Sequence, residues 1–258
     1  MLVAENVSYQ IEGKYLVKNF SFVFDKNKFI VIMGKNGAGK TTVLKMLSGG
    51  LKPQSGKITL DGKDIFSIKP GMFAKKRAML SQNYDISFPI EVNELIMMGR
   101  YPYFRSRPTI DDVRICDETM RMLNIEELKE RDYNTLSGGE ARKVHLARTL
   151  AQVWQEEEPK ILFLDEPIAN LDLKYQFEII KIAKERTSYN TLVVAVLHDI
   201  NLANQFADEI IFMKDGEIHS IKKKNQSIGS LPLGEIFSAN FKIIKEPESG
   251  EEFAVLSD

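Results

Sequence analysis

The chain has 258 residues, 43% of them hydrophobic and 28% charged, and its 35 Lys and Arg against 36 Asp and Glu leave a formal net charge of -1 at pH 7. This length suits one domain with a sizeable core, and the balanced charge disfavours a basic protein that binds nucleic acid through its net field. The single cysteine, Cys116, excludes a disulfide within the chain. No apolar run approaches the roughly 18 residues of a membrane helix, and the first residues lack a signal-peptide pattern. We therefore expect a cytoplasmic protein that does not span a membrane.

Short strands are expected at the start of the chain, between turns rich in Gly, Asn and Lys. Their sequences are LVAENVSYQI (2–11), YLVKNFSFVF (15–24), KFIVIM (28–33) and GKITL (56–60). Residues 15–24 alternate between apolar and polar, which indicates a strand with one buried face. FIVIM is apolar throughout, which is typical of a strand buried on both faces.

The segment GKNGAGKTT (34–42) follows that buried strand directly and fits the phosphate-loop pattern G-x-x-x-x-G-K-[ST]. In such a loop backbone N–H groups converge on phosphate oxygens, and the next helix presents its N-terminus to the anion. Lys40 is expected to reach the β- and γ-phosphates, and Thr41 to bind Mg²⁺. A glycine turn without a ligand is disfavoured, because TTVLKML supplies the expected helix. The nucleotide-binding residues of this loop are expected to be Gly34, Asn36, Gly37, Gly39, Lys40, Thr41 and Thr42.

Residues from about 84 to 150 have the pattern of a helical insert, because apolar residues recur three and four positions apart. The expected helices lie within EVNELIMMGR (91–100), DDVRICDETMRML (111–123) and ARKVHLARTLAQVW (141–154). Cys116 lies in the second of them and is expected to be a buried packing residue rather than a nucleophile. His145 in the third matches no site pattern and is expected to be an ordinary residue.

Two further apolar runs, ILFL (161–164) and TLVVAVL (191–197), flank the helical segment YQFEIIKIAKERT (175–187). Strands apolar on both faces that alternate with helices indicate a covered, mainly parallel sheet. Asp165 and Glu166 follow the first run. Asp165 suits the shell of Mg²⁺, and Glu166 is placed to polarise an attacking water. The charge runs QEEEP (155–159) and KKK (222–224) are typical of solvated loops.

The segment LSGGE (136–140) places Ser137, Gly138 and Gly139 at the start of a helix, which makes a second helix N-terminus able to hold phosphate. Between the phosphate loop and LFLDEP, this segment is very specific: the chain resembles the ATP-binding subunits of ABC transporters from about residue 2 to 220. The resemblance implies an α/β P-loop ATPase with a mainly parallel sheet, an antiparallel N-terminal β lobe and a helical insert at about 84–150. It implies ATP and Mg²⁺ as cofactors.

The same resemblance implies one ABC-type domain over 1–258. Its core would comprise about 1–83 and 151–220, its helical subdomain about 84–150, and its C-terminal tail about 221–258.

The resemblance also assigns residues outside the phosphate loop. Gln82 matches the glutamine that touches Mg²⁺ and water, and His198 matches the histidine that contacts the γ-phosphate. Asp172 matches the aspartate that links the two sites of a dimer. Tyr9 matches the aromatic residue that stacks on adenine, with Tyr15 as the competing candidate. The expected catalytic residues are Glu166, His198 and Gln82, and the expected metal ligands are Thr41, Gln82 and Asp165.

The chain departs from the common family pattern directly after LSGGE. Two glutamines and an arginine are common there, whereas this chain has Ala141, Arg142 and Lys143. The hydrogen bonding of this stretch therefore stays open.

The resemblance implies partners as well. Two copies would sandwich two ATPs, with Ser137 of one copy capping the ATP held by Lys40 of the other. The pair would drive a permease dimer as a peripheral complex on the cytoplasmic face of the cell (inner) membrane, and a substrate-binding protein would take part indirectly. Residues 83–104 are expected to form the docking groove, with core packing of its aromatic residues as the alternative. Those groove residues are Phe88, Pro89, Tyr101, Tyr103 and Phe104.

Longer stretches of the sequence indicate which cargo the importer would carry. FPIEVNELIMMGRYPY (88–103) and VLHDINLANQFADEIIFMKDGEI (196–218) resemble the iron-complex importers, which serve haem, siderophores and cobalamin. RDYNTLSGGE (131–140) and the insert EEEP (156–159) look most like the haem-import ATPases, so haem import is expected. Ferric siderophore or cobalamin import is the alternative within this branch. A soluble ABC ATPase of DNA repair or translation is disfavoured, because the chain has neither tandem ATPase domains nor a coiled-coil insert.

Overall fold

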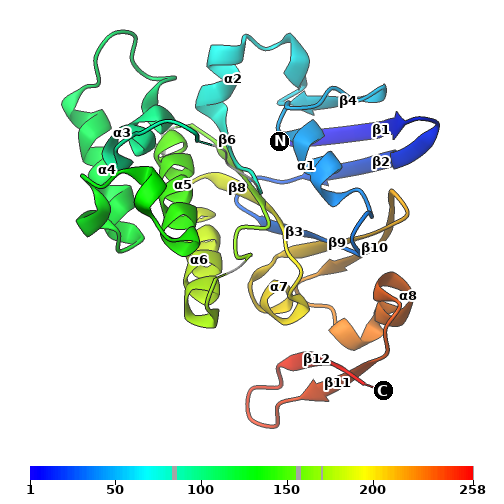
Figure 1. The fold of residues 1–258 in the computed structure, drawn as a ribbon. Coiled ribbons are helices and arrows are strands. Elements are labelled where there is room, and N and C mark those ends of the chain that lie inside the picture. The colour runs from blue at the N-terminus through cyan, green and yellow to red at the C-terminus, as the bar shows by residue number, and fades with distance from the viewer. Residues whose placement is uncertain (83–85, 155–157, 170, 258) are drawn as a thin grey trace.

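A six-stranded sheet with the order β10-β9-β3-β8-β7-β6 forms the centre of the molecule (Figure 1). The computed structural model describes residues 1–82, 86–154, 158–169 and 171–257. All strands of this sheet run parallel except β10, which is antiparallel to β9. The mainly parallel sheet expected from the apolar runs is therefore confirmed. The strands are β3 (Phe29–Met33), β6 (Arg77–Leu80), β7 (Lys160–Asp165), β8 (Thr191–Val196), β9 (Glu209–Lys214) and β10 (Glu217–Lys223).

Successive side chains of the central strands point into two different cores, which is why these strands are apolar throughout. In β3, Ile30 and Ile32 pack with helix α1 (Lys40–Leu47) and the N-terminal strands. Phe29, Val31 and Met33 pack into the other core, which is built largely from the helices. Both sets are fully buried, as the period of two along a covered strand requires.

A second, four-stranded antiparallel sheet with the order β2-β1-β4-β5 lies on one side of the central sheet, at the right of Figure 1. It is the antiparallel N-terminal β lobe that the resemblance implied. In β2, Val17, Phe20 and Phe24 are fully buried, and the residues between them are exposed or half-buried. Its strands are β1 (Leu2–Ile11), β2 (Lys14–Phe24), β4 (Ser55–Leu60) and β5 (Lys63–Asp64).

Helices gather on the opposite side, at the left of Figure 1, where the periodicity predicted them. They are α3 (Val92–Met97), η2 (Met98–Arg100), α4 (Ile110–Met122), η3 (Glu126–Leu128), η4 (Tyr133–Thr135) and α5 (Gly138–Gln152). Cys116 is buried in α4, and burial raises the pKa of its thiol to about 12. The thiol therefore stays protonated at neutral pH, as a packing residue should. Among the described residues, none of the helices is both long and apolar enough to be a membrane span.

Three further helices border the central sheet, namely α2 (Pro70–Lys76), α6 (Leu173–Arg186) and α7 (Ile200–Phe206), while η1 (Ile65–Ser67) contacts β4. After β10 the chain forms η5 (Ile228–Ser230), α8 (Leu233–Phe237) and a hairpin of β11 (Phe241–Lys245) and β12 (Glu252–Leu256). Asn201 of α7 holds this hairpin, because its side chain donates to the Ala254 carbonyl (3.1 Å) and accepts from the Ala254 N–H (2.9 Å).

The expectation of a solvated loop at 222–224 is wrong in part. Lys222 and Lys223 belong to β10, and Lys222 is only 3% exposed. In the other charge run, residues 155–157 lie outside the described residues.

Candidate functional site

The loop between β3 and α1 is shaped by the strands on either side of it. A Cβ on Gly34 would lie 2.2 Å from the carbonyl oxygen of Met213 in β9, and a Cβ on Gly39 would lie 2.2 Å from that of Leu16 in β2. Both glycines also have positive φ, at 149° and 94°. Their smallness therefore lets the loop pack against two sheets, a reason that the pattern alone did not reveal.

Lys40 begins α1 and is 6% exposed. Its Nζ donates to the carbonyl oxygens of Gly34 and Lys35, each at 2.9 Å. Burial lowers the pKa of Lys40, while the nearby carboxylates of Glu166 and Asp165 raise it. Burial has the larger effect, so the pKa of Lys40 lies below its ordinary value.

A pocket of about 500 Å³ opens above this loop. It collects nine of the predicted site residues, from the phosphate loop and from the ends of three strands, and Leu16 also lines it. The residues that line it are Leu16, Asn36, Gly37, Gly39, Lys40, Thr41, Thr42, Gln82, Glu166 and His198.

Asp165 and Thr41 lie together beside the pocket. Thr41 Oγ1 donates to Asp165 Oδ1 at 3.1 Å, and Asp165, the last residue of β7, is 1% exposed. Burial raises the pKa of Asp165, and the hydrogen bond from Thr41 lowers it. A hydroxyl and a carboxylate in contact are oxygen donors of the kind that Mg²⁺ prefers, so the pair fits that ion.

Glu166 connects the remaining catalytic candidates. Its Oε2 accepts from Gln82 Nε2 at 2.9 Å, and its Oε1 lies 2.8 Å from Nε2 of His198. Its backbone is left-handed, with φ 48°, an uncommon conformation for a residue with a side chain. The structure therefore brings Glu166, Gln82 and His198 into direct contact.

Ser137 and Asp172 lie away from this pocket. Ser137 caps α5 in a capping box, accepting from the Glu140 N–H while Glu140 accepts from the Ser137 N–H. Ser137, Gly138 and Asp172 are exposed, and neither LSGGE nor Asp172 lines the pocket. Within a single chain the two candidate phosphate cradles are thus separate.

The structure does not bring either tyrosine candidate to the pocket. Tyr9 is half-buried in β1 opposite Val17, and Tyr15 is exposed at the start of β2. Leu16 lines the pocket instead. Its apolar character on the outward side of an alternating strand was the signal that could have identified it. Tyr9 as the adenine-stacking residue stays a prediction.

A second cavity, of about 540 Å³, lies between α3, α4 and the loop that follows η2. Tyr101 and Phe104 line it together with Met97 and Met98. Phe88 and Pro89 are exposed but do not line it. Asn83, where the expected groove begins, lies outside the described residues, as do 84 and 85.

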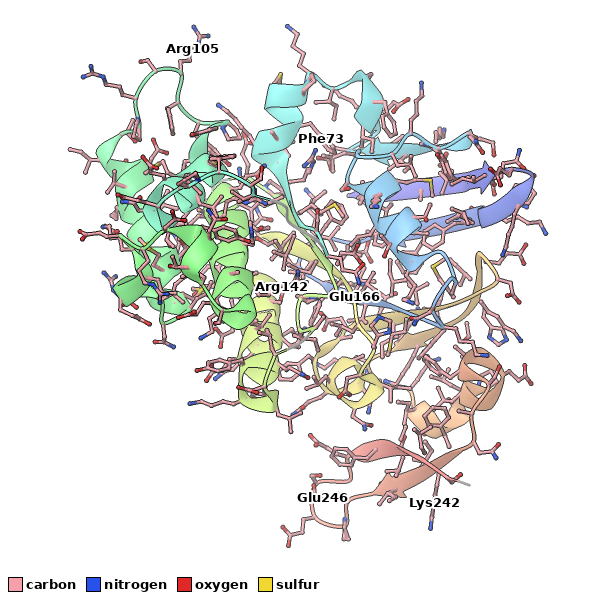
Figure 2. All side chains as sticks on the ribbon, viewed as in Figure 1. Phe73, Arg105, Arg142, Glu166, Lys242 and Glu246 are labelled. Atoms are coloured by element: carbon pink, nitrogen blue, oxygen red, sulfur yellow. The ribbon has the colours of Figure 1, made fainter. Side chains whose placement is uncertain are left out.

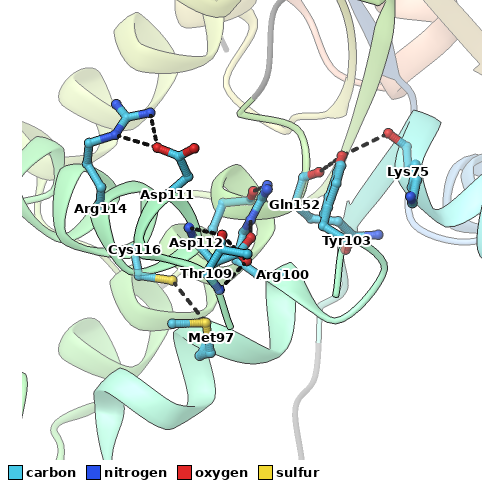
Figure 3. A network of polar contacts seen from close by, with 11 residues as sticks. Lys75, Met97, Arg100, Tyr103, Thr109, Asp111, Asp112, Arg114, Cys116 and Gln152 are labelled. Carbon is cyan, nitrogen blue, oxygen red and sulfur yellow. Dashed lines mark hydrogen bonds and ion pairs between the residues drawn. The ribbon is translucent and has the colours of Figure 1, made fainter. Parts of the chain in front are cut away.

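Tyr103, which was also expected in the docking groove, does not line this cavity. Figure 3 shows its hydroxyl pointing to the ends of two other helices, within hydrogen-bond distance of the carbonyl oxygens of Lys75 (3.1 Å) and Gln152 (2.8 Å). Its ring packs 3.8 Å from the guanidinium of Arg100. The side chain therefore faces the interior, where hydrogen bonds offset the burial of its hydroxyl.

Comparisons with known proteins agree with this geometry. A family model described as ABC transporter matches residues 17–169. The hemin import ATP-binding protein HmuV of Escherichia coli O157:H7 is 34% identical over 258 residues, with 99% of each chain covered. A protein of the same name from Rhodopseudomonas palustris (strain ATCC BAA-98 / CGA009) is 39% identical over 223 residues, which are 84% of this chain and 80% of that one.

Two solved structures have the same fold. A dimeric ATP-binding cassette, bound to ADP and Pi in a post-hydrolysis state, is 27% identical with a TM-score of 0.76, and 88% of this chain and 100% of that chain align. A metal-chelate type ABC transporter in an inward-facing conformation aligns over 99% of this chain and 96% of that chain, with a TM-score of 0.80. At 21% identity the second likeness concerns the fold alone.

Proposed function

The chain belongs to the ABC transporter family, and from this premise we propose that it is the ATP-hydrolysing motor of a haem importer. It is an ATP-binding cassette ATPase. The observation that supports haem as the cargo is the 34% identity to a hemin import ATP-binding protein across 99% of both chains. Ferric siderophore import is the runner-up.

We assign the chemistry to the residues of the first pocket. Lys40 and the N–H groups of the phosphate loop bind the β- and γ-phosphates. Glu166 polarises the attacking water, and His198 contacts the γ-phosphate. Thr41, Asp165 and Gln82 hold Mg²⁺, which neutralises phosphate charge when it is bound. This assignment is supported by the position of these groups, which all lie near the carboxyl ends of the parallel strands of the central sheet.

The active form in this proposal is a two-fold dimer that encloses two ATPs. Ser137 and Asp172 are exposed and separate from the pocket of their own chain, so they are free to complete the site of a second copy. Helix α5 then offers its N-terminus to the phosphates held by the other Lys40. The dimeric cassette at 27% identity supports this arrangement.

The partner that this dimer moves is a permease dimer, and the cavity lined by Tyr101 and Phe104 is the proposed docking groove. Its apolar lining, with polar residues such as Lys129 and Glu94, suits a protein interface. The motor would thus lie peripherally on the cytoplasmic face of the inner membrane. A substrate-binding protein would deliver haem to the permease without contacting the motor.

Growth on defined iron sources tests the cargo. A strain deleted for this chain receives haem or a ferric siderophore as its sole iron source, with wild type or Lys40→Ala supplied on a plasmid. Loss of growth on haem alone, restored by wild type and not by Lys40→Ala, supports the proposal. Loss confined to the siderophore moves the cargo to the runner-up.

Affinity purification from detergent-solubilised membranes tests the functional class. A co-purifying polytopic membrane protein supports a transport motor. Co-purification with ribosomes or DNA ends contradicts it.

A further inference from the structure

The Arg142 side chain donates hydrogen bonds to five backbone carbonyls. This residue lies in the stretch where the chain departs from the common family pattern. It lies on α5, five residues after Ser137, and is 9% exposed. Its Nε donates to Pro167 O at 3.2 Å, its Nη1 to Ser81 O at 3.0 Å and Gln82 O at 3.1 Å, and its Nη2 to Asp165 O at 2.9 Å and to Glu166 O. A guanidinium has five N–H donors in a rigid fork, which matches the number of these contacts.

The five carbonyls belong to two segments that carry catalytic candidates. Residues 81 and 82 follow β6 and end in Gln82, and residues 165–167 surround Glu166 at the end of β7. Figure 2 labels Arg142 next to Glu166, and the Arg142 side chain on α5 donates to the Glu166 carbonyl. One side chain therefore joins the backbones of the two residues whose side chains meet at 2.9 Å.

The backbone of Glu166 is where such support matters most. Its φ of 48° lies in the left-handed region, which costs free energy for a residue with a Cβ and persists only where the surroundings hold it. The Arg142 side chain donates to the carbonyl oxygens of the residue before Glu166, of Glu166 itself and of the residue after it. Without the fork, the peptide at Glu166 would be free to turn, and its carboxylate would leave His198 and Gln82.

We propose that Arg142 is a positioning residue that fixes Glu166 and Gln82 for ATP hydrolysis and ties both to the helix that begins at LSGGE. The inference rests on the proposed ATPase function of this site. Ser137 and Arg142 lie in the first turns of the same helix, α5. A contact made at the helix N-terminus can therefore affect the orientation of Glu166 through Arg142. Docking of LSGGE on the ATP of a second copy is thereby coupled to the placement of Glu166 in its own chain.

Arg142→Gln and Arg142→Lys in the purified full-length protein test this proposal. Gln supplies two donors and Lys three without the planar fork, so neither can hold all five carbonyls. We expect kcat for ATP hydrolysis to fall at least about 10-fold in both variants, since a misplacement of about 1 Å can cost roughly 10²-fold. KM and the affinity for a fluorescent ATP analogue should stay within threefold, because Lys40 and its loop are untouched.

Lys143→Met is the matched control. It removes one positive charge from the same helix, but its Nζ lies 3.7 Å from the ring centroid of Tyr175 and away from the carbonyl cluster. We expect kcat within twofold of wild type. An equal loss of kcat in this control would mean that any charge change on α5 disturbs turnover, which overturns the proposal.

Two further outcomes also count against the inference. If wild type hydrolyses ATP and both Arg142 variants keep its kcat, the inference fails while the proposed function stands. If both variants lose analogue binding together with kcat, Arg142 supports the fold rather than the carboxylate. A wild type with no ATP hydrolysis would instead refute the proposed function, and this inference with it.

Discussion

Nε2 of His198 lies 2.8 Å from Oε1 of Glu166 although the two residues are 32 positions apart in the sequence. The sheet order explains their meeting, because β7 lies between β8 and β6. Carboxyl ends of parallel strands share one edge of the sheet, where ligands bind in open α/β folds. Glu166 follows β7, His198 follows β8, and Gln82 follows β6. The acid is therefore flanked by one neighbour from each adjoining strand.

Glu166→Gln tests the assignment of the acid. The substitution keeps the shape and the hydrogen-bonding capacity but removes the carboxylate, so ATP binding should persist while turnover falls by roughly 10²- to 10⁴-fold. Steady-state ATPase assays measure the loss, and size-exclusion chromatography with ATP should detect an accumulated dimer. Glu185→Gln, on the exposed side of α6, is the control. A Glu166→Gln activity within threefold of wild type would show that another group is the catalytic acid.

Tyr101→Ala and Phe104→Ala test the docking groove. Both residues line the second cavity and neither contacts the phosphate loop, so basal ATP hydrolysis should stay within twofold while permease binding and haem transport fall at least fivefold. Truncation of an aromatic hot-spot residue at an interface costs about 2 kcal/mol or more. Co-purification with the permease and uptake into proteoliposomes measure the effect. Phe88→Ala is the control from the same segment, and normal transport by both groove variants would mean that docking occurs elsewhere.

Local patterns revealed most of the site in advance. The phosphate loop, the acids after ILFL and the histidine after TLVVAVL each depend on a strand and the few residues that follow it. Lys40, Asp165 and Glu166 were therefore candidates from the local pattern, whereas His198 became one only through the family resemblance. The covered parallel sheet was identifiable for the same reason, since apolar runs of four to seven residues encode burial on both faces.

Features that depend on partners far along the chain were not identifiable. Arg142 finds its carbonyl acceptors 60 and 61 residues before it and 23 to 25 after it, and no local pattern encodes such distances. Tyr103 reads as one more aromatic residue of a groove, but its hydroxyl lies at the ends of α2 and α5. Three consecutive lysines predict a loop at Lys222. The strand forms there because this segment pairs with β9.

Tyr103→Phe tests the interior placement of that tyrosine. The substitution removes only the hydroxyl that lies near the Lys75 and Gln152 carbonyls, so we expect the free energy of unfolding to fall by about 1 to 2 kcal/mol. Permease binding should be unchanged, because the hydroxyl does not face the cavity. Urea unfolding measures the first quantity, and the control is Tyr101→Phe, at a residue that is 56% exposed. Equal stability of wild type and Tyr103→Phe would contradict the hydrogen bonds described here.

The burial of His145 predicts how the free energy of unfolding depends on pH. The residue is 1% exposed on α5, and its Nε2 lies 2.9 Å from the hydroxyl of Tyr133. Burial, together with the positive charges of Arg148 and Arg142, lowers the pKa of His145 to about 3. The folded protein therefore keeps this ring neutral at pH 5, whereas an unfolded chain protonates it below about pH 6.5.

The sign of the effect follows from that difference. Below pH 6.5 the unfolded state binds the extra proton, so stability is full above this pH and is lost as the pH falls toward about 3. Between pH 7 and pH 5 this one group should lower the free energy of unfolding by about 2 kcal/mol. Urea unfolding at the two pH values measures the difference in wild type, in His145→Gln and in the control His219→Gln. The difference should shrink only in His145→Gln, which has no group that titrates at this position. The same pH dependence in wild type and His145→Gln would show that the buried ring is not the cause.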